Sequence, residues 1–282
     1  MRFIDRDSII PKVQQLIDEA EKAHGELLQE NDLSERERYI DNHRNVWVAF
    51  RPAFEQLSHN KCWYTESVNP GTDDDVDHFR PKGNLADDDN HGGYWWEALD
   101  WRNFRLSCHR ANRLRRNPET GKTHGKGDHF PLLNEADRCR TPADDLGRER
   151  PLLLDPTDPF DPPLLTFSIE GTTAVSPEFE QDANAARRVE ASRIYLHLEW
   201  PEFNEQRLKL YNRIVIKIND GERQARRISD GDIGSREALT AIARDLVDMT
   251  KEEQPYSKAA KAYIANYRHI WWIKDAVLPN CQ

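Results

Sequence analysis

The sequence predicts a mostly α-helical α+β protein, and two observations support this prediction. Apolar residues recur at helical spacing near both ends of the chain. In the middle, from about residue 58 to residue 135, that period is lost, and short extended pieces alternate with Gly, Pro, Asn and Asp. This texture is typical of short strands and loops. We therefore expect a small mixed region flanked by helices.

Two helices are expected before the mixed region. Ser8 can cap a helix over residues 8–30, which has Pro11 in its first turn. This helix carries its apolar residues on one face, so it should be half buried. A capping-box pattern at Ser34 and Glu37 then opens a second helix.

Helical patterns return after a Pro-rich stretch. Residues 151–177 are rich in proline and contain a predicted β-hairpin. Beyond them we predict four helices, over roughly residues 181–197, 202–218, 235–249 and 257–277. We interpret the aromatic stripe of the last helix, which includes Tyr263 and Trp271, as packing. The chain thus divides into an N-terminal helical segment (1–57), a core (58–135), a connector (136–180) and a C-terminal helical region (181–282).

The composition is that of a globular protein with a heavily charged surface. Charged residues make up 32% of the chain and apolar residues 37%, and the net charge is −10. No apolar run approaches the roughly 20 residues that a membrane span needs, and the N-terminus lacks the apolar stretch of a signal peptide. We therefore expect a cytoplasmic protein with no membrane partner. The four cysteines are widely spaced, so a disulfide framework is not expected.

Positive charge is concentrated in one segment. Between residues 100 and 130 the chain has eight Lys or Arg and three Asp or Glu, although the whole chain is acidic. Such a segment is expected to contact nucleic acid phosphates. The alternative is an ordinary solvated helix face, and the sequence leaves both interpretations open.

Three short segments hold the candidate catalytic residues. Asp77 and His78 are adjacent in DVDHFRPK, Asn103 lies in DWRNFRLSC, and Asn112 follows in ANR. A carboxylate is a good hard ligand for Mg²⁺ or Mn²⁺. A neutral His is the usual general base near neutral pH. In the alternative interpretation His78 is a structural partner of Asp77, and the asparagines are helix caps or turn residues.

In this order and spacing, the three segments resemble the HNH endonuclease family, whose core is a ββα fold around one metal ion. The runs CWYTE, GYWW, KGDHFPL and PLLLDP narrow the resemblance to the PtuB group, the HNH nucleases of Septu-type or retron-associated anti-phage defence. The similarity covers residues 58–180 well, whereas the terminal helices match loosely or hardly at all.

The resemblance implies a role for each candidate residue. Asp77 and Asn112 should hold one Mg²⁺ or Mn²⁺ per active site, His78 should be the general base, and Asn103 should hold the loop or the histidine in place. The resemblance also implies an SMC-like ATPase partner of the PtuA type. Phosphate charge would be met by nearby cationic residues, namely Arg80, Lys82, Arg110, Arg113, Arg115, Arg116 and Lys126.

One departure from the family concerns zinc. Many HNH proteins bind a structural Zn²⁺ through two CxxC pairs. The matching runs here are CWYT and CHRA, which leave only Cys62 and Cys108, so a structural zinc is not expected. His59 and His109 could complete a substitute site with these two cysteines, but packing in place of the zinc is the preferred interpretation.

The implied reaction is metal-dependent hydrolysis of phosphodiester bonds. DNA is the first choice of substrate, and RNA, including tRNA, is the second, because the sequence shows no base-reading module. The alternative from a different class is a catalytically silent subunit that binds nucleic acid or serves as a scaffold.

Overall fold

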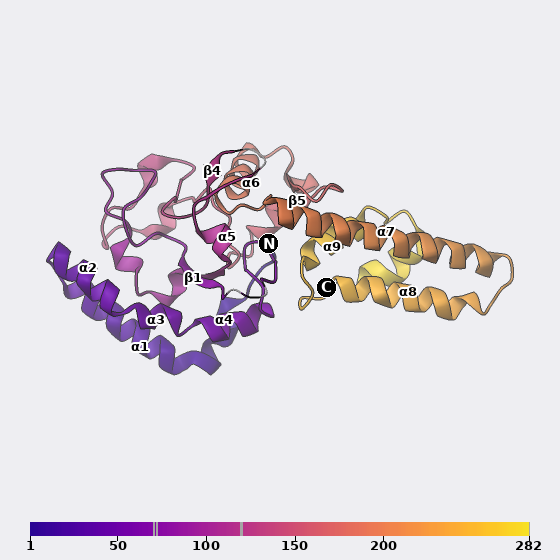
Figure 1. Ribbon diagram of the computed structural model, residues 1–282, viewed down its shortest axis with the longest axis horizontal. Helices are drawn as coiled ribbons and strands as arrows, with labels where there is room; N and C mark the ends of the chain where they lie inside the picture. Colours follow the sequence, from indigo (N-terminus) through magenta and orange to yellow (C-terminus); the bar gives the residue numbers. More distant parts are fainter. Residues whose placement is uncertain (70, 72, 119–120, 282) are drawn as a thin grey trace. The chain divides into compact units, whose positions relative to one another are not determined.

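The computed structural model describes residues 1–69, 71, 73–118 and 121–281 (Figure 1). This part of the chain is largely helical and contains three small sheets, each made of two short strands. The predicted α+β, mostly helical class is therefore confirmed. It divides into two compact units. The first unit is Met1–Leu164 with Val175–Leu198, and the second is Leu165–Ala174 with Glu199–Gln282.

The first unit begins with four helices, and its helices are α1 (Ile10–Gln29), α2 (Leu33–Asn42), α3 (Arg44–Val48), α4 (Arg51–Ser58), α5 (His109–Asn112) and α6 (Ala183–Tyr195). The predicted apolar face of α1 is confirmed, because side chains from Val13 to Leu27 are buried on it. They share a core with Phe104 and Leu106 from the central region. The N-terminal helices therefore cover the strands that hold the candidate site.

The predicted caps of the first two helices are wrong. Ser8 lies in a 3-10 turn before α1, and its hydroxyl donates to the carbonyl of Asp5 at 2.6 Å. The cap of α2 is Asp32, whose carboxylate accepts from the backbone N–H of Glu35 at 3.0 Å, whereas Ser34 lies inside the helix. An aspartate is as good an N-cap as serine, so the helix starts two residues earlier than the capping-box pattern indicates.

Two of the strands lie at the centre of the first unit. β1 (Asp75–His78) and β2 (Phe104–Ser107) are antiparallel, with Asp77 opposite Arg105 and His78 opposite Phe104. The short helix α5 follows β2 almost directly. Two further pairs are β3 (Arg115–Arg116) with β4 (Thr123–His124), and β5 (Leu165–Phe167) with β6 (Thr173–Val175), the predicted hairpin.

The second unit is built on a helical hairpin. Figure 1 shows α7 (Pro201–Ser229) running beside α8 (Ser235–Met249), with α9 (Ser257–Ala265) packed against α7. The helix predicted over 235–249 is confirmed, whereas the one predicted over 202–218 continues to Ser229. The segment predicted as a single helix over 257–277 ends at Ala265 and gives way to a π turn (Ile273–Val277) and a 3-10 turn (Leu278–Asn280). None of the helices described here has the length and apolar character to cross a membrane.

The aromatic stripe near the C-terminal end is only partly buried. Tyr263 is fully buried and Trp272 is 1% exposed, so packing explains both. Trp271 is 59% exposed. The packing interpretation is therefore wrong for Trp271, which faces solvent.

Candidate active site

The β1–β2 pair brings Asp77 and His78 into the same buried neighbourhood. Asp77 is 5% exposed and His78 is 8% exposed. Although adjacent residues of a strand point to opposite faces, both line one hollow of about 420 Å³. Asn112 of α5 lines the same hollow. Three of the four candidate catalytic residues are thus brought together.

Each carboxylate oxygen of Asp77 has a partner. Tyr64 donates its hydroxyl to Oδ2 at 2.9 Å, and the Lys126 ammonium donates to Oδ1 at 2.8 Å. Lys126 is 1% exposed and also donates to the backbone carbonyl of His78 at 2.5 Å. Burial raises the pKa of Asp77 above its usual value, and the Lys126 ammonium opposes that shift. The result is a buried carboxylate matched by a buried cation.

The His78 ring packs between two aromatic rings and makes one hydrogen bond. Its ring makes edge contacts with Trp47 and Phe104, with centroid distances of 5.0 and 5.2 Å. Nε2 lies 2.8 Å from the carbonyl oxygen of Ala98. A carbonyl only accepts, so the proton is on Nε2 and Nδ1 carries the lone pair. Burial lowers the pKa of His78 to about 3, which keeps the ring neutral near pH 7.

Asn103 does not line the hollow but fixes the chain that leaves β1. Its side-chain oxygen accepts from the backbone N–H of Arg80 at 2.8 Å, and its amide nitrogen donates to the carbonyl of Arg80 at 2.9 Å. The same nitrogen donates to the carbonyl of Glu97 at 3.1 Å. This one side chain therefore joins the loop after β1 to the segment that carries the Ala98 carbonyl.

Asn112 is positioned from both sides of α5. Its amide nitrogen donates to Asp75 at 3.1 Å, and its backbone carbonyl accepts from Gly127 at 2.7 Å. Arg113 also reaches Asp75, at 3.2 Å. These contacts use the amide nitrogen of Asn112 and leave its side-chain oxygen as an acceptor at the hollow.

The predicted phosphate-binding residues fall into two groups. Lys82, Arg113 and Lys126 line the hollow, and Arg115 and Arg116 are exposed on β3 close behind α5 in the chain. Arg110 is half-buried on α5. Arg80 instead pairs with the buried Glu149 at 2.8 Å. With Lys126 also paired, neither Arg80 nor Lys126 offers a free charge to a phosphate in this structure.

Several residues that shape this site were not identified from the sequence. Tyr64 donates to Asp77 across 13 positions of the chain, and Glu149 pairs with Arg80 across 69. Ala98 contributes only its backbone carbonyl, and Asp128 lines the hollow. The single signal for any of them was that CWYTE and KGDHFPL resembled family runs. Pairing over such sequence distances leaves no local pattern.

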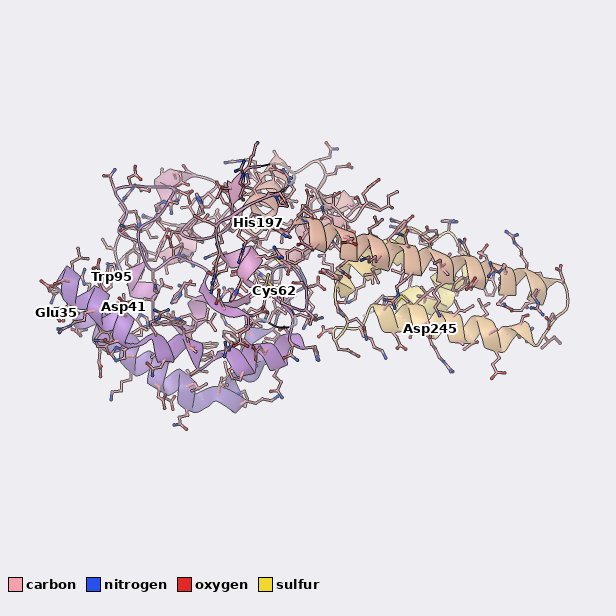
Figure 2. The ribbon with its side chains drawn as sticks, in the orientation of Figure 1. Glu35, Asp41, Cys62, Trp95, His197 and Asp245 are labelled. Atoms are coloured by element: carbon pink, nitrogen blue, oxygen red, sulfur yellow. The ribbon has the colours of Figure 1, made fainter. Side chains whose placement is uncertain are left out.

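Cys62 (labelled in Figure 2) and Cys108 lie side by side at the positions left from the CxxC pairs. The backbone N–H of Cys108 donates to Sγ of Cys62 at 3.3 Å, and the Thr65 hydroxyl lies 3.9 Å from Sγ of Cys108. Burial opposes ionisation of Cys62, but hydrogen bonds from Cys108 and Thr65 lower its pKa to about 6. Within the described ranges, no three His, Cys, Asp or Glu side chains are grouped to hold a metal ion, so the substitute set with His59 and His109 is not assembled.

A comparison with curated proteins relates this chain to a defence protein. The chain is 30% identical over 168 residues to the Septu protein PtuB of Bacillus mycoides (strain KBAB4), a match that covers 58% of this chain and 51% of the relative. The chain thus spans about half the length of this curated relative. No family model matches the sequence, and no solved structure matches it. The resemblance to the PtuB group is confirmed over the matched residues.

Proposed function

We propose that this chain is a metal-dependent endonuclease of the HNH type that hydrolyses phosphodiester bonds, with β1, β2 and α5 as its ββα-metal core. The observation that supports this most directly is the shared hollow, which Asp77, His78 and Asn112 line together. A carboxylate, a neutral imidazole and an amide oxygen are the groups that such a reaction uses to hold a hard cation and activate water.

His78 is the proposed general base. Its Nε2 proton is committed to the Ala98 carbonyl, so Nδ1 is the nitrogen that can accept a proton from water. The pKa of about 3 makes the free imidazole a weak base. A phosphate anion bound nearby would stabilise the imidazolium and raise that pKa toward the range where proton transfer is efficient. Substrate binding itself would therefore prepare the base.

Asp77 and Asn112 are the proposed ligands of one Mg²⁺ or Mn²⁺. Their donors are a carboxylate and an amide oxygen, which suit hard cations. The Lys126 ammonium lies 2.8 Å from Oδ1 of Asp77, so it would have to share the carboxylate with the metal or move aside when the metal binds. When bound, the metal would act as a Lewis acid on the phosphate. Lys82 and Arg113 would meet the remaining phosphate charge from the rim.

Asn103 and Arg80 are proposed to position the base. Asn103 connects the loop after β1 to the segment that carries the Ala98 carbonyl, and the Arg80–Glu149 pair anchors that loop. Arg80 is therefore better assigned to holding the site than to phosphate contact. DNA remains the favoured substrate, with RNA as the second choice.

The relative's name, Septu protein PtuB, supports a role in anti-phage defence. We propose that this chain is the effector nuclease of such a system and works with an SMC-like ATPase. A nuclease of this kind must be silent in the uninfected cell, so its activity would depend on that partner.

One observation favours the alternative of a catalytically silent subunit. Lys126 and Tyr64 occupy both oxygens of Asp77, so a divalent ion would have to displace or join them. A chain that keeps this arrangement would bind nucleic acid without cutting it.

The test is cleavage of plasmid DNA and of total RNA, with Mn²⁺, Mg²⁺ or EDTA, in the presence of the ATPase. We expect metal-dependent cutting by the wild type, and a loss of about 10²–10⁴-fold for His78→Ala, the usual contribution of a general base. His24→Ala, on α1 and away from the hollow, is the control and should cut normally. Cutting that survives His78→Ala would exclude this assignment, and a wild type that binds but never cuts would establish the silent subunit.

A further inference from the structure

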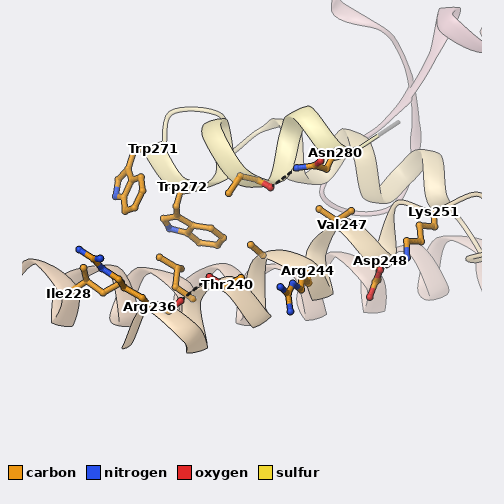
Figure 3. Close-up of a pocket in the computed structure, with 13 residues that line it drawn as sticks. Ile228, Arg236, Thr240, Arg244, Val247, Asp248, Lys251, Trp271, Trp272 and Asn280 are labelled. Carbon is orange, nitrogen blue, oxygen red and sulfur yellow. Dashed lines mark hydrogen bonds and ion pairs between the residues drawn. The ribbon is translucent and has the colours of Figure 1, made fainter. Parts of the chain in front are cut away.

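The second unit contains a groove that the proposed chemistry does not use. Its volume is about 780 Å³. Figure 3 shows its two walls: α8, which carries Arg236, Thr240 and Arg244, and the C-terminal turns, which carry Trp271 and Trp272. The groove lies within one unit and is independent of the site around Asp77.

Local packing fixes Trp272 in one wall of the groove. Trp272 fits against α7 only because residue 221 is glycine, since a Cβ there would lie 2.3 Å from Cζ2 of the indole. The indole Nε1 of Trp272 donates to Glu222 at 2.9 Å, which fixes the ring. The side chain before it, Trp271, is 59% exposed and lines the groove.

The groove is elongated. Its lining on α8 runs from Arg236 to Asp248, which corresponds to roughly 18 Å at the helical rise per residue. The opposite wall is formed by Trp271, Trp272, Ala276 and Asn280. A space of this form fits one row of side chains from an elongated segment better than one compact ligand.

The floor and the rim of the groove differ in chemistry. The floor is apolar and is formed mainly by Leu239, Ala243, Val247, Trp272 and Ala276. On the rim, the guanidinium groups of Arg236 and Arg244 have no hydrogen bond or ion pair with the described residues. The rim cation Lys251, in contrast, pairs with Asp248 at 2.6 Å. Arg236 and Arg244 are two helical turns apart, so they present two positive charges roughly 12 Å from each other.

We propose that this groove binds an amphipathic helix of a partner protein, with apolar side chains on the floor and two carboxylates, spaced about two turns apart, on Arg236 and Arg244. Recognition of this kind uses an apolar helix face in an apolar groove. Single-stranded nucleic acid fits the groove less well, because bases need aromatic platforms, and Trp271 is the exposed ring among the lining residues. The proposal does not rest on the nuclease function.

The test uses two labelled synthetic helices of about four turns and the full chain. One peptide has leucines on one face and two glutamates two turns apart, and the other has lysines in place of those glutamates. We expect the acidic peptide to bind, with fluorescence anisotropy as the readout, and the lysine peptide to bind at least ten times more weakly.

Variants of the full chain locate the binding. Arg236→Glu with Arg244→Glu should weaken the acidic peptide at least ten-fold and recover binding of the lysine peptide. Thr240→Trp, at an exposed position in the groove, should block both. The matched control is Arg213→Glu with Lys274→Glu, which makes the same charge change on exposed residues outside the groove lining and should bind like the wild type.

Three outcomes would overturn the proposal. The first is no binding of the acidic peptide up to about 1 mM, the weak end of specific affinities. The second is displacement of the bound peptide by single-stranded oligonucleotide in a manner that depends on Trp271, which would assign the groove to nucleic acid. The third is self-association of the wild type that is lost in the double arginine variant, which would assign it to a second copy of this chain.

Discussion

The two units of this protein differ in what they bury. The first unit encloses ion pairs, among them Lys126 with Asp77, Arg105 with Asp155 and Arg188 with Asp161. The second encloses mainly aliphatic and aromatic side chains of α7, α8 and α9. Burying a charge costs free energy that pairing only partly returns. The buried ion pairs of the first unit therefore fix the geometry of its polar groups at a cost in stability. The apolar core of the second unit carries no such cost.

Net charge separates the units in the same way. The residues of the second unit include 14 acidic and 14 basic side chains, so the whole net charge of −10 belongs to the first. A nucleic acid is repelled by such a surface except near cations, such as Lys82 at the hollow and the exposed Arg115 and Arg116 of β3. Local cations in an acidic unit would restrict phosphate contact to one place.

The largest effect should come from breaking a buried pair in the first unit. Lys126→Met keeps the length of the side chain but leaves the Asp77 carboxylate without its cation. We expect a loss of about 3–5 kcal/mol in the free energy of unfolding, because an uncompensated charge remains buried. Denaturant unfolding measures it. Lys251→Met, which removes an exposed pair with Asp248 in the second unit, should leave the midpoint unchanged. Equal losses of unfolding free energy in the two variants would contradict the proposed difference between the two units.

The next effect should appear as a dependence of stability on pH. Burial raises the pKa of Asp74 to about 8. The folded protein then holds a proton that the unfolded chain releases near pH 4, so this group's contribution to stability is present at low pH and is lost as the pH rises from about 4 to 8. Asp74→Asn cannot ionise and should lose less stability over this range, by up to about 1.4 kcal/mol per pH unit.

The difference between the melting curves of wild type and Asp74→Asn, measured at pH 5 and pH 8, isolates Asp74 from other groups that titrate in this range. A difference that stays constant between the two pH values would show that Asp74 is hydrated. The polar interior of the first unit would then be wetter than its burial indicates.

The smallest effects should come from two glycines with opposite signs. Gly221→Ala places a methyl group against Trp272, and overpacking of this kind costs about 1–3 kcal/mol. Gly25→Ala in α1 meets nothing within 4 Å and should stabilise by about 0.4–1 kcal/mol, because alanine has less freedom in the unfolded chain. Thermal unfolding of both variants tests whether the two changes in stability have opposite signs. Stabilisation by Gly221→Ala would contradict the tight packing of Trp272 against α7.

The sequence predicted the helical parts of both units because periodicity is a local signal. The helix over 235–249 and the hairpin at β5 and β6 are examples. The helix predicted to end near residue 218 continues to Ser229 through Gly221, where the missing side chain admits Trp272. The exposure of Trp271 was missed because the predicted helix was extended to residue 277, whereas α9 ends at Ala265. Helical spacing does not describe the residues beyond that end.

The sequence placed three candidate residues near one another but did not predict the side chains that contact them. Asp77, His78 and Asn112 came from short motifs, and the structure brings them to one hollow. Lys126 was expected to meet phosphate, yet it pairs with Asp77. The sequence shows that Lys126 is positively charged. It does not show that Asp77 is its partner, because 49 positions separate the two residues.

The contacts of Asn103 have a consequence for how this chain matures. One amide joins residues 80 and 97, and the Lys126 ammonium joins residues 77 and 78 to a distant loop. A ribosome must therefore release more than 120 residues before the hollow can close, and a proteolytic cut anywhere between these points would separate the parts. The hollow is therefore completed only when the segment that carries Lys126 has emerged and packed against β1.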